Sequence, residues 1–180
     1  DKLVGCLAAN LKQDAPAVRV AALEELAKLD VIPASLSSPL DRALSDRETE
    51  IRGLAALAMA RLRDKRRTTG VLVLALEDAD PTVKQRVLQA LSQLGDAATP
   101  AVGKVLAQLG SAETETRIAA IECLQKLGKN ASEAFPALKD LATTGSEPIR
   151  KSSIESIRKI AQDPKDAVEV LIGGLDDSEW

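Results

Sequence analysis

The sequence predicts an all-α fold of stacked helix pairs with no sheet. Three observations predict it: one pattern of apolar and charged residues returns five times, its apolar positions follow the period of a helix, and no stretch keeps the two-residue alternation of a strand. The composition agrees, because 45% of the 180 residues are hydrophobic while only one Phe and one Trp are present. A core of small aliphatic side chains suits helices that pack closely.

The repeated pattern is clearest in residues 78–95, which read DADPTVKQRVLQALSQLG. Counted from an anchor at Pro81, apolar residues stand at +2, +6, +7, +10 and +13, a base stands at +3, and Gly95 closes the pattern at +14. The same frame fits at four further anchors, so that successive anchors lie 33, 32, 33 and 33 residues apart: Pro16, Thr49, Thr114 and Glu147. This regularity indicates a repeat protein, in which each repeat buries its apolar face only against its neighbours.

The first helix of each repeat, helix A, begins at the anchor. The offsets +2, +6, +10 and +13 lie on one face of a helix. The further apolar residue at +7 widens this stripe so much that the helix must be covered on more than one side. We expect the side chains of Asp14, Asp80 and Ser146 to cap these helices at their N-termini, and Gly95 and Gly128 to end them.

A second apolar series stands at −5, −9 and −12 from the next anchor and predicts a second helix, helix B, antiparallel to helix A. The predicted array is continuous and consists of a half repeat at 1–13, full repeats at 14–46, 47–78, 79–111, 112–144 and 145–176, and the start of another at 177–180. Because the array begins half a repeat late and stops as a repeat begins, we expect an excerpt of a longer protein. Uncapped ends of this kind could associate head to tail.

The motif DxxPxVRxxAxxxLxxLG, followed by a second helix that a proline initiates, resembles the HEAT repeat, in its bacterial HEAT-like or lyase-type variety. The resemblance covers nearly the whole chain. It implies a right-handed α-solenoid of about five helix pairs plus an N-terminal half repeat, with the B helices lining the concave side. It also implies a ladder of carboxylate–base pairs, Asp14 with Arg19 and Asp80 with Lys84. Three further arginines continue the basic side of this ladder: Arg52, Arg117 and Arg150.

Composition and motifs exclude several kinds of catalytic site. The chain has no His, which removes Ser-His-Asp, Cys-His and HExxH chemistry, and it has no GxGxxG or GxxxxGK[ST] loop. Cys6 in the half repeat and Cys123 in the fourth A helix are too far apart in the array to form a disulfide, and both are expected in the core. We therefore predict a protein that is not an enzyme and holds neither a metal nor a cofactor.

The charge pattern has one local exception to a weakly acidic chain. Net charge is −3, and no segment reaches the roughly 18 apolar residues of a membrane span, so a cytoplasmic location is the default expectation. The exception is a basic patch of five bases in seven residues: Arg61, Arg63, Lys65, Arg66 and Arg67. A solvated loop at a helix end tolerates such cations, while an acidic partner or a phosphate could also bind there. Single bases in the other loops argue against nucleic acid.

Small residues dominate the predicted inner surface of the B helices. They leave the backbone accessible to a docked helix or extended peptide, although tight helix packing would also explain them. The candidate partner-binding residues are Arg42, Leu74, Lys104, Gln108, Asp140 and Glu169. The sequence favours a non-catalytic scaffold that binds a protein or peptide through the concave face or through the ridge loops that join helices A and B. Two alternatives stay open: an accessory subunit or domain of a bilin-attachment-like lyase, and a nucleic-acid binder that uses loop 61–67.

Overall fold

The computed structural model describes residues 2–175, with the side chains at 164, 169, 171 and 173–175 left out of the description. The described chain is all-α, as predicted, and contains eleven α-helices joined by short 3-10 segments and loops. It forms two compact units, which divide between Ala97 and Ala98 and are described one at a time. The 3-10 segment Gly95–Ala101 spans this division.

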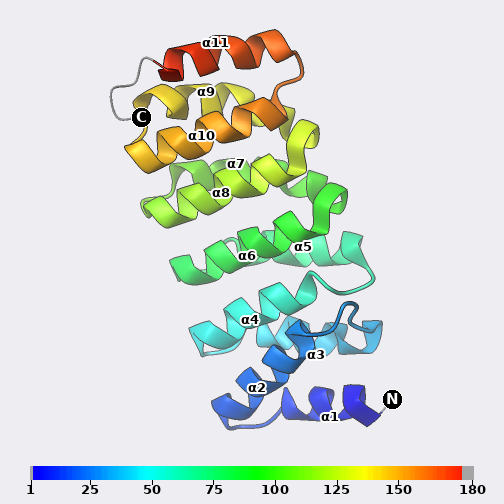
Figure 1. Ribbon diagram of the computed structural model, residues 1–180. Coiled ribbons are helices and arrows are strands. Elements are labelled where there is room, and N and C mark those ends of the chain that lie inside the picture. Colours follow the sequence, from blue (N-terminus) through cyan, green and yellow to red (C-terminus); the bar gives the residue numbers. More distant parts are fainter. Residues whose placement is uncertain (1, 176–180) are drawn as a thin grey trace. The chain divides into compact units, whose positions relative to one another are not determined.

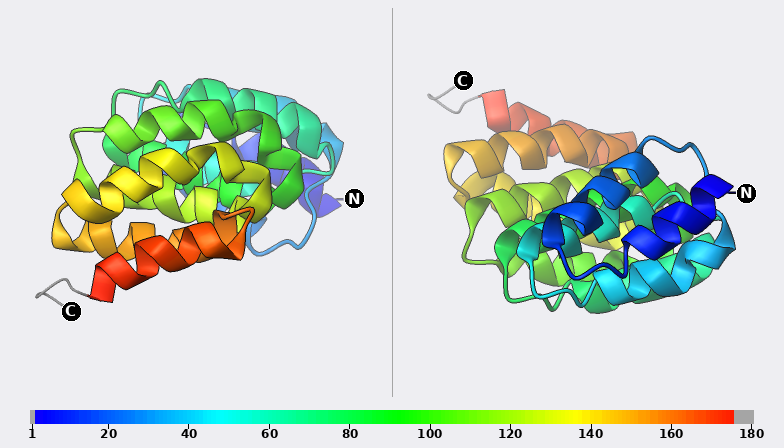
Figure 2. Two further views of the ribbon diagram at one scale, coloured as in Figure 1. Left: turned by 90° about the horizontal axis from the view of Figure 1, so that it is seen from above. Right: turned by 90° about the horizontal axis from the view of Figure 1, so that it is seen from below.

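Unit 1 consists of two layers of helices (Figure 1). The A helices α2, α4 and α6 lie side by side, and each of the B helices α1, α3 and α5 packs on the A helix that follows it in the chain. Figure 2 shows α1 beside α2 in the view from below. The bounds are α1 (Lys2–Asn10), α2 (Pro16–Ala27), the 3-10 turn Ala34–Leu36, α3 (Ser37–Ala43), α4 (Thr49–Met59), α5 (Lys65–Ala75) and α6 (Pro81–Leu94).

Unit 2 has the same organisation. The A helices α8 and α10 pack together, α7 lies against α8, and α9 lies against α10. The last helix, α11, contacts both α9 and α10, as the view from above in Figure 2 shows. The bounds are α7 (Val102–Ala107), 3-10 turns at Gln108–Gly110 and Gly128–Ala134, α8 (Thr114–Leu127), α9 (Phe135–Thr144), α10 (Glu147–Ile160) and α11 (Pro164–Leu175).

Burial along the A helices confirms the helical phase that the repeat predicts. In α6 the residues at +2, +6, +10 and +13 are all buried, and the one at +7, Leu88, is fully buried as well. Gln93, which falls outside this stripe, is exposed. The first copy of the pattern differs at two positions, because Val18 of α2 is 36% exposed and Leu29, at +13, is only half-buried. The core of each unit therefore lies between the two helix layers and between neighbouring A helices.

The helix ends follow the prediction only in part. Gly95 and Gly128 end α6 and α8 with φ values of 58° and 56°, in the left-handed region that favours glycine. Asp80 caps α6, since its carboxylate accepts a hydrogen bond of 2.8 Å from the N–H two residues on. The predictions for Asp14 and Ser146 are wrong: Ala15 occupies the cap position of α2, and the Ser146 side chain makes no capping hydrogen bond to α10.

Arginines at the +3 position tie consecutive repeats of unit 1 together. Nη1 of Arg19 donates to the carbonyl oxygens of Gln13 and Asp14, both at 2.8 Å, in the loop ahead of its own helix. The rest of the same guanidinium faces the carboxylate of Asp46, which belongs to the loop ahead of the next A helix, with Nη2 3.0 Å from Oδ1 and Nε 2.8 Å from Oδ2. One side chain thus holds two successive loops in register.

Arg52 repeats this arrangement one step along the chain. Its Nη1 donates to the carbonyl oxygens of Asp46 and Arg47 at 3.0 and 3.2 Å. Its Nε and Nη2 bind the carboxylate of Asp78 at 2.7 and 3.1 Å. Asp46 is therefore bound by Arg19 through its side chain and by Arg52 through its carbonyl oxygen. Both ion pairs are largely shielded from solvent, with side chains 13–16% exposed.

The predicted pairing of the ladder is consequently wrong in its partners. Arg19 contacts the carbonyl oxygen of Asp14 and not its carboxylate, and Asp80 uses its carboxylate to cap α6. Lys84 makes no ion pair with any of the described residues. The physical reason is that a side chain in the first turn of a helix points back toward the N-terminus. From there it reaches its own preceding loop and the equivalent loop of the next repeat.

The two bound carboxylates have lowered pKa values. Burial alone would raise the pKa of Asp46, but the hydrogen bonds from Arg19 and from the N–H of Glu48 outweigh it and hold that pKa below its usual 3.8. At Asp78, burial is likewise outweighed by hydrogen bonds from Arg52 and from the N–H of Asp80, and the pKa is again lowered from 3.8. Both side chains are therefore ionised, and bound, at neutral pH.

At the junction between α9 and α10 in unit 2, a threonine replaces the equivalent carboxylate. Thr144 stands at the −3 position that Asp46 and Asp78 occupy in unit 1, and its hydroxyl donates to the carbonyl oxygen of Asp140 at 2.9 Å. Arg117, which would be its partner, donates to the hydroxyl of Thr114 at 3.2 Å, and its buried Nε has no hydrogen-bond partner among the described residues. This junction therefore keeps an arginine at +3 but has no carboxylate at −3 for it to bind.

We expect the variant Asp46→Asn with Asp78→Asn to be less stable than the wild type at neutral pH, by about 1–3 kcal/mol per lost charged hydrogen-bonded pair. Because both folded-state pKa values lie below 3.8, the stabilisation is complete above about pH 4 and is lost as the pH falls through the lowered values. Urea unfolding across this range should therefore show the two proteins converging in acid. Glu122→Gln with Glu133→Gln, which changes two exposed carboxylates, is the matched control. A stability difference that does not change with pH would contradict the conclusion that the ionised carboxylates of Asp46 and Asp78 stabilise the fold.

We expect Thr144→Asp to stabilise unit 2 by about 0.5–1 kcal/mol, because it supplies a carboxylate where Arg117 Nε is buried without a partner. Thermal unfolding of four proteins gives the test: the wild type, Thr144→Asp, Arg117→Gln and the double variant. The gain should disappear in the Arg117→Gln background. Thr143→Asp adds the same charge one residue away and should give no such coupling. Equal gains with and without Arg117 would show that the new carboxylate does not form an ion pair with Arg117.

Candidate interaction surfaces

Two successive ridge loops of unit 1 lie side by side and fix the position of the side chains around them. The N–H of Ile32, in the loop after α2, donates to the carbonyl oxygen of Arg61, in the loop after α4, at 2.8 Å. Ile32 and Leu62 form an isolated parallel bridge, and both side chains are buried. Residues next to this bridge on both loops, such as Val31 and Arg63, therefore line the same hollow.

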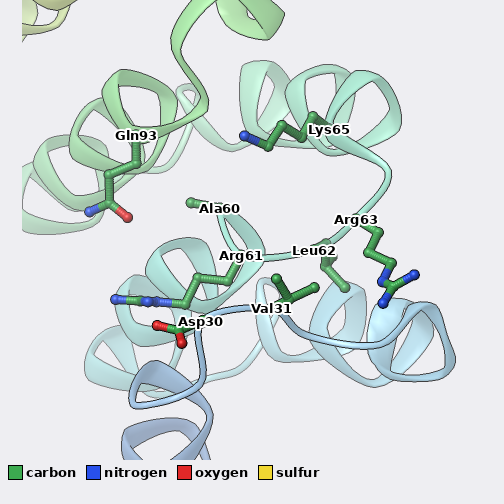
Figure 3. A pocket seen from close by; sticks show the side chains of 8 residues that line it. All are labelled: Asp30, Val31, Ala60, Arg61, Leu62, Arg63, Lys65 and Gln93. Atoms are coloured by element: carbon green, nitrogen blue, oxygen red, sulfur yellow. The ribbon is translucent and has the colours of Figure 1, made fainter.

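That space is an open hollow of about 510 Å³, which we call the ridge hollow. Figure 3 shows Lys65 at the start of α5 and Gln93 near the end of α6 on one side, with Val31 and Arg61 on the other. Val31 is 51% exposed, so the hollow has an apolar patch in a polar rim. Its lining residues are Asp30, Val31, Ala60, Arg61, Leu62, Arg63, Lys65 and Gln93.

The ridge hollow divides the predicted basic patch. Arg61, Arg63 and Lys65 line it, and Nη1 of Arg61 is fixed by donating to the carbonyl oxygen of Leu29 at 3.0 Å. Arg66 is exposed but is not among the lining residues. Arg67 forms an ion pair with Asp41 of α3. The five bases thus do not act as one surface, because the turn into α5 directs them to different sides.

A second hollow, of about 390 Å³, lies between the B helices α3 and α5, and we call it the B-helix hollow. Leu74, one of its lining residues, is 73% exposed, the highest exposure among the large hydrophobic residues described. Arg42, the neighbouring candidate on α3, is also exposed. The hollow is lined by four aliphatic residues, one serine and three acidic residues: Leu44, Val71, Leu74, Ala75, Ser45, Asp41, Glu77 and Asp78.

The other candidate residues lie in unit 2. Lys104 on α7 and Asp140 on α9 are exposed, and Gln108 in the following 3-10 turn is half-buried. The side chain of Glu169, on α11, lies outside the described residues. The structure thus brings Arg42 and Leu74 to two B helices that line one hollow of unit 1, while the candidates of unit 2 are distributed over three further B helices, α7, α9 and α11.

A third hollow, of about 400 Å³, lies on the A-helix side of unit 1 and was not predicted. It is lined by short side chains of α2 and by three glutamates: Glu24, Glu48 and Glu50. The alanines at 17 and 21, which fall outside the apolar stripe of the repeat, are the signal in the sequence that could have indicated it. Val31 and Gln93 of the ridge hollow were missed too, because neither belongs to the repeat pattern.

The two cysteines are free and differ in exposure. Cys123 is buried, as predicted, and burial raises the pKa of its thiol to about 12, so that it stays protonated at neutral pH. Cys6 is exposed, and the prediction that it lies in the core is wrong, because α1 buries only Leu7.

The described residues lack two further kinds of feature. They contain no group of three or more His, Cys, Asp and Glu side chains placed to hold a metal ion. Among the same residues there is no helix with the length and apolar character to cross a membrane.

Comparisons with known proteins place the chain in a family. A family model described as HEAT repeats matches residues 36–109 and 102–180. No protein with a curated description matches the sequence. An engineered protein is structurally similar, with a TM-score of 0.68 and 20% identity over 97% of this chain and 85% of that one.

Two further similar structures are complexes. One is the complex of CpcE and CpcF of phycocyanin lyase from Nostoc sp. PCC7120, with a TM-score of 0.72 and 23% identity over 94% of this chain and 69% of that one. The other is a designed armadillo repeat protein bound to the peptide (KR)4, with a TM-score of 0.67 and 18% identity over 86% and 80%. At these identities the structures show a shared helical-repeat fold. Together with the family match over residues 36–180, they show that this chain belongs to the HEAT repeat family.

Proposed function

We propose that the chain is a non-catalytic scaffold that binds a protein or peptide partner through the B-helix side of unit 1. The observation that carries this proposal is the exposure of Leu74, 73% of whose surface is open to solvent over an apolar hollow. Leu44 and Val71 are half-buried in the same hollow, so an incoming apolar side chain would contact three aliphatic groups. Covering a leucine side chain completely contributes about 1.5–3 kcal/mol.

The polar groups around Leu74 suit a partner that is held in one orientation. Asp41 and Asp78 line the same hollow, and each is bound by an arginine of unit 1 and therefore fixed in position. Arg42 is exposed on the same helix as Asp41 and offers a cation beside them. Protein interfaces commonly combine an apolar centre with a polar rim.

Two similar structures support binding as the activity, since one holds a peptide and the other a second protein chain. Nothing about the B-helix hollow calls for catalysis: its lining consists of aliphatic side chains, a serine and carboxylates. We therefore assign it a role in recognition and not in a reaction.

Selection of a displayed library of short random peptides on the whole chain tests this proposal. We expect enriched peptides to bind the wild type and to lose about tenfold or more in affinity in both Leu74→Ala and Leu74→Asp, a loss of about 1.4 kcal/mol or more. Gln89→Asp places the same charge on an exposed position of α6 and should leave binding unchanged. Because Leu74 is exposed, its variants should keep the thermal stability of the wild type. Peptides that bind equally well to the Leu74 variants and to the wild type would contradict the proposal.

A further inference from the structure

The ridge hollow is an electropositive site on a chain with a net charge of −3. Three cations line it, Arg61, Arg63 and Lys65, against one carboxylate, Asp30. Charge of one sign gathered in a concave site attracts a ligand of the opposite sign more strongly than the same charges spread over a flat surface.

The site also has fixed and apolar parts that a simple solvated loop would not need. Arg61 is held by its hydrogen bond to the carbonyl oxygen of Leu29, and the loop beneath it is held by the bridge between Ile32 and Leu62. Val31 remains 51% exposed although its neighbour Ile32 is fully buried. The hollow thus presents a preformed apolar contact beside two exposed cations, which lowers the ordering cost of binding.

We infer that the ridge hollow binds an acidic peptide segment, with carboxylates on Arg63 and Lys65 and an apolar side chain on Val31. Gln93 and the carboxylate of Asp30 lie at the edges of the hollow, where they can accept hydrogen bonds from the N–H groups of an extended chain (Figure 3). Arg61, already bound to a carbonyl oxygen, contributes charge more than a new contact.

The same features favour a peptide over a nucleic acid. Phosphate backbones are bound by cations repeated along a surface, whereas these cations lie within one turn between α4 and α5. Unstacked bases need aromatic platforms, and no aromatic residue lines the hollow. A carboxylate in the site, Asp30, opposes a dense row of phosphates, but it suits a peptide with free N–H groups.

This inference rests on the proposed function, because it names a second recognition surface of the same scaffold and the class of partner that fits it. The two surfaces use different residues, Leu74 in one and Arg63, Lys65 and Val31 in the other. If binding at the ridge hollow fails, the proposal for the B-helix hollow can still hold, and the reverse is also true.

The test uses the whole chain and a fluorescently labelled short peptide in which glutamates flank a leucine. We expect binding that weakens steeply as salt is added. The charge-reversal variant Arg63→Glu with Lys65→Glu should lose about tenfold or more in affinity, and Val31→Ser should lose severalfold without any change of charge. Peptides selected through Leu74 should still bind the charge-reversal variant, which keeps the two proposals distinct.

Lys12→Glu with Arg47→Glu is the matched control, since it reverses two exposed cations elsewhere in unit 1 and changes the net charge equally. This control should retain the affinity of the wild type. Equal loss in the control and the test variant would overturn the inference, because it would show attraction to overall charge alone. Tighter binding of a short single-stranded oligonucleotide than of the acidic peptide, with the same dependence on Arg63 and Lys65, would overturn it in favour of nucleic acid.

Discussion

The structure depends on the fact that the A helices carry apolar surface on more than one side. In α4 the residues Ile51, Ala55, Ala56 and Met59 are all completely buried, and the helix contacts α2, α3 and α6. A single helix pair cannot cover such a helix, so further pairs must be stacked against it at a nearly constant spacing. In unit 2 the same requirement is met where α10 packs against α8, α9 and α11. The uniform repeat length follows from this need for cover.

A constant spacing has a second effect, because it brings residues one repeat apart into contact. Three polar contacts of unit 1 join positions 26, 27 and 32 residues apart: Arg52 with Asp78, Arg19 with Asp46, and Arg61 with Leu29. The ion pair of Arg67 with Asp41 belongs to the same class and connects the basic patch to the B-helix hollow. Both proposed binding surfaces are therefore assembled from side chains that are distant in sequence and neighbours in the stack.

This explains which features could be predicted from the sequence. The side of a helix that is apolar can be read from residues three and four positions apart, so the buried stripe of α6 and the glycines that end α6 and α8 were predicted correctly. The partner of Arg19 could not be found in this way, because its own loop and the next loop offer carboxylates at equally plausible positions. The resemblance to the HEAT repeat implies Asp14 as the partner of Arg19, but the structure shows that the partner is Asp46.

The hollows were harder still to predict. The ridge hollow joins two loops and the end of a third A helix, and Val31 and Gln93 have no place in the repeat pattern. The basic patch indicated the right region but not its division, since only the geometry of the turn into α5 separates Arg63 and Lys65 from Arg67. Among the candidates on the B helices, Leu74 was predicted from its register alone, and its exposure agrees with that register.

Asp46 is bound by two arginines, by Arg19 through its carboxylate and by Arg52 through its carbonyl oxygen, and this has a consequence for how the molecule opens. Because Arg19 and Arg52 both bind this residue, one repeat of unit 1 cannot detach without disturbing the contacts of the repeats before and after it. Such coupling favours concerted opening, and the amide hydrogens of neighbouring repeats should then exchange with solvent at similar rates. At Thr144 in unit 2 the corresponding coupling is missing, so the helix pairs on either side of that junction can fluctuate more independently. The junction at Asp46 is thus strongly coupled and the junction at Thr144 weakly coupled, and local unfolding can start at Thr144 without spreading to neighbouring repeats.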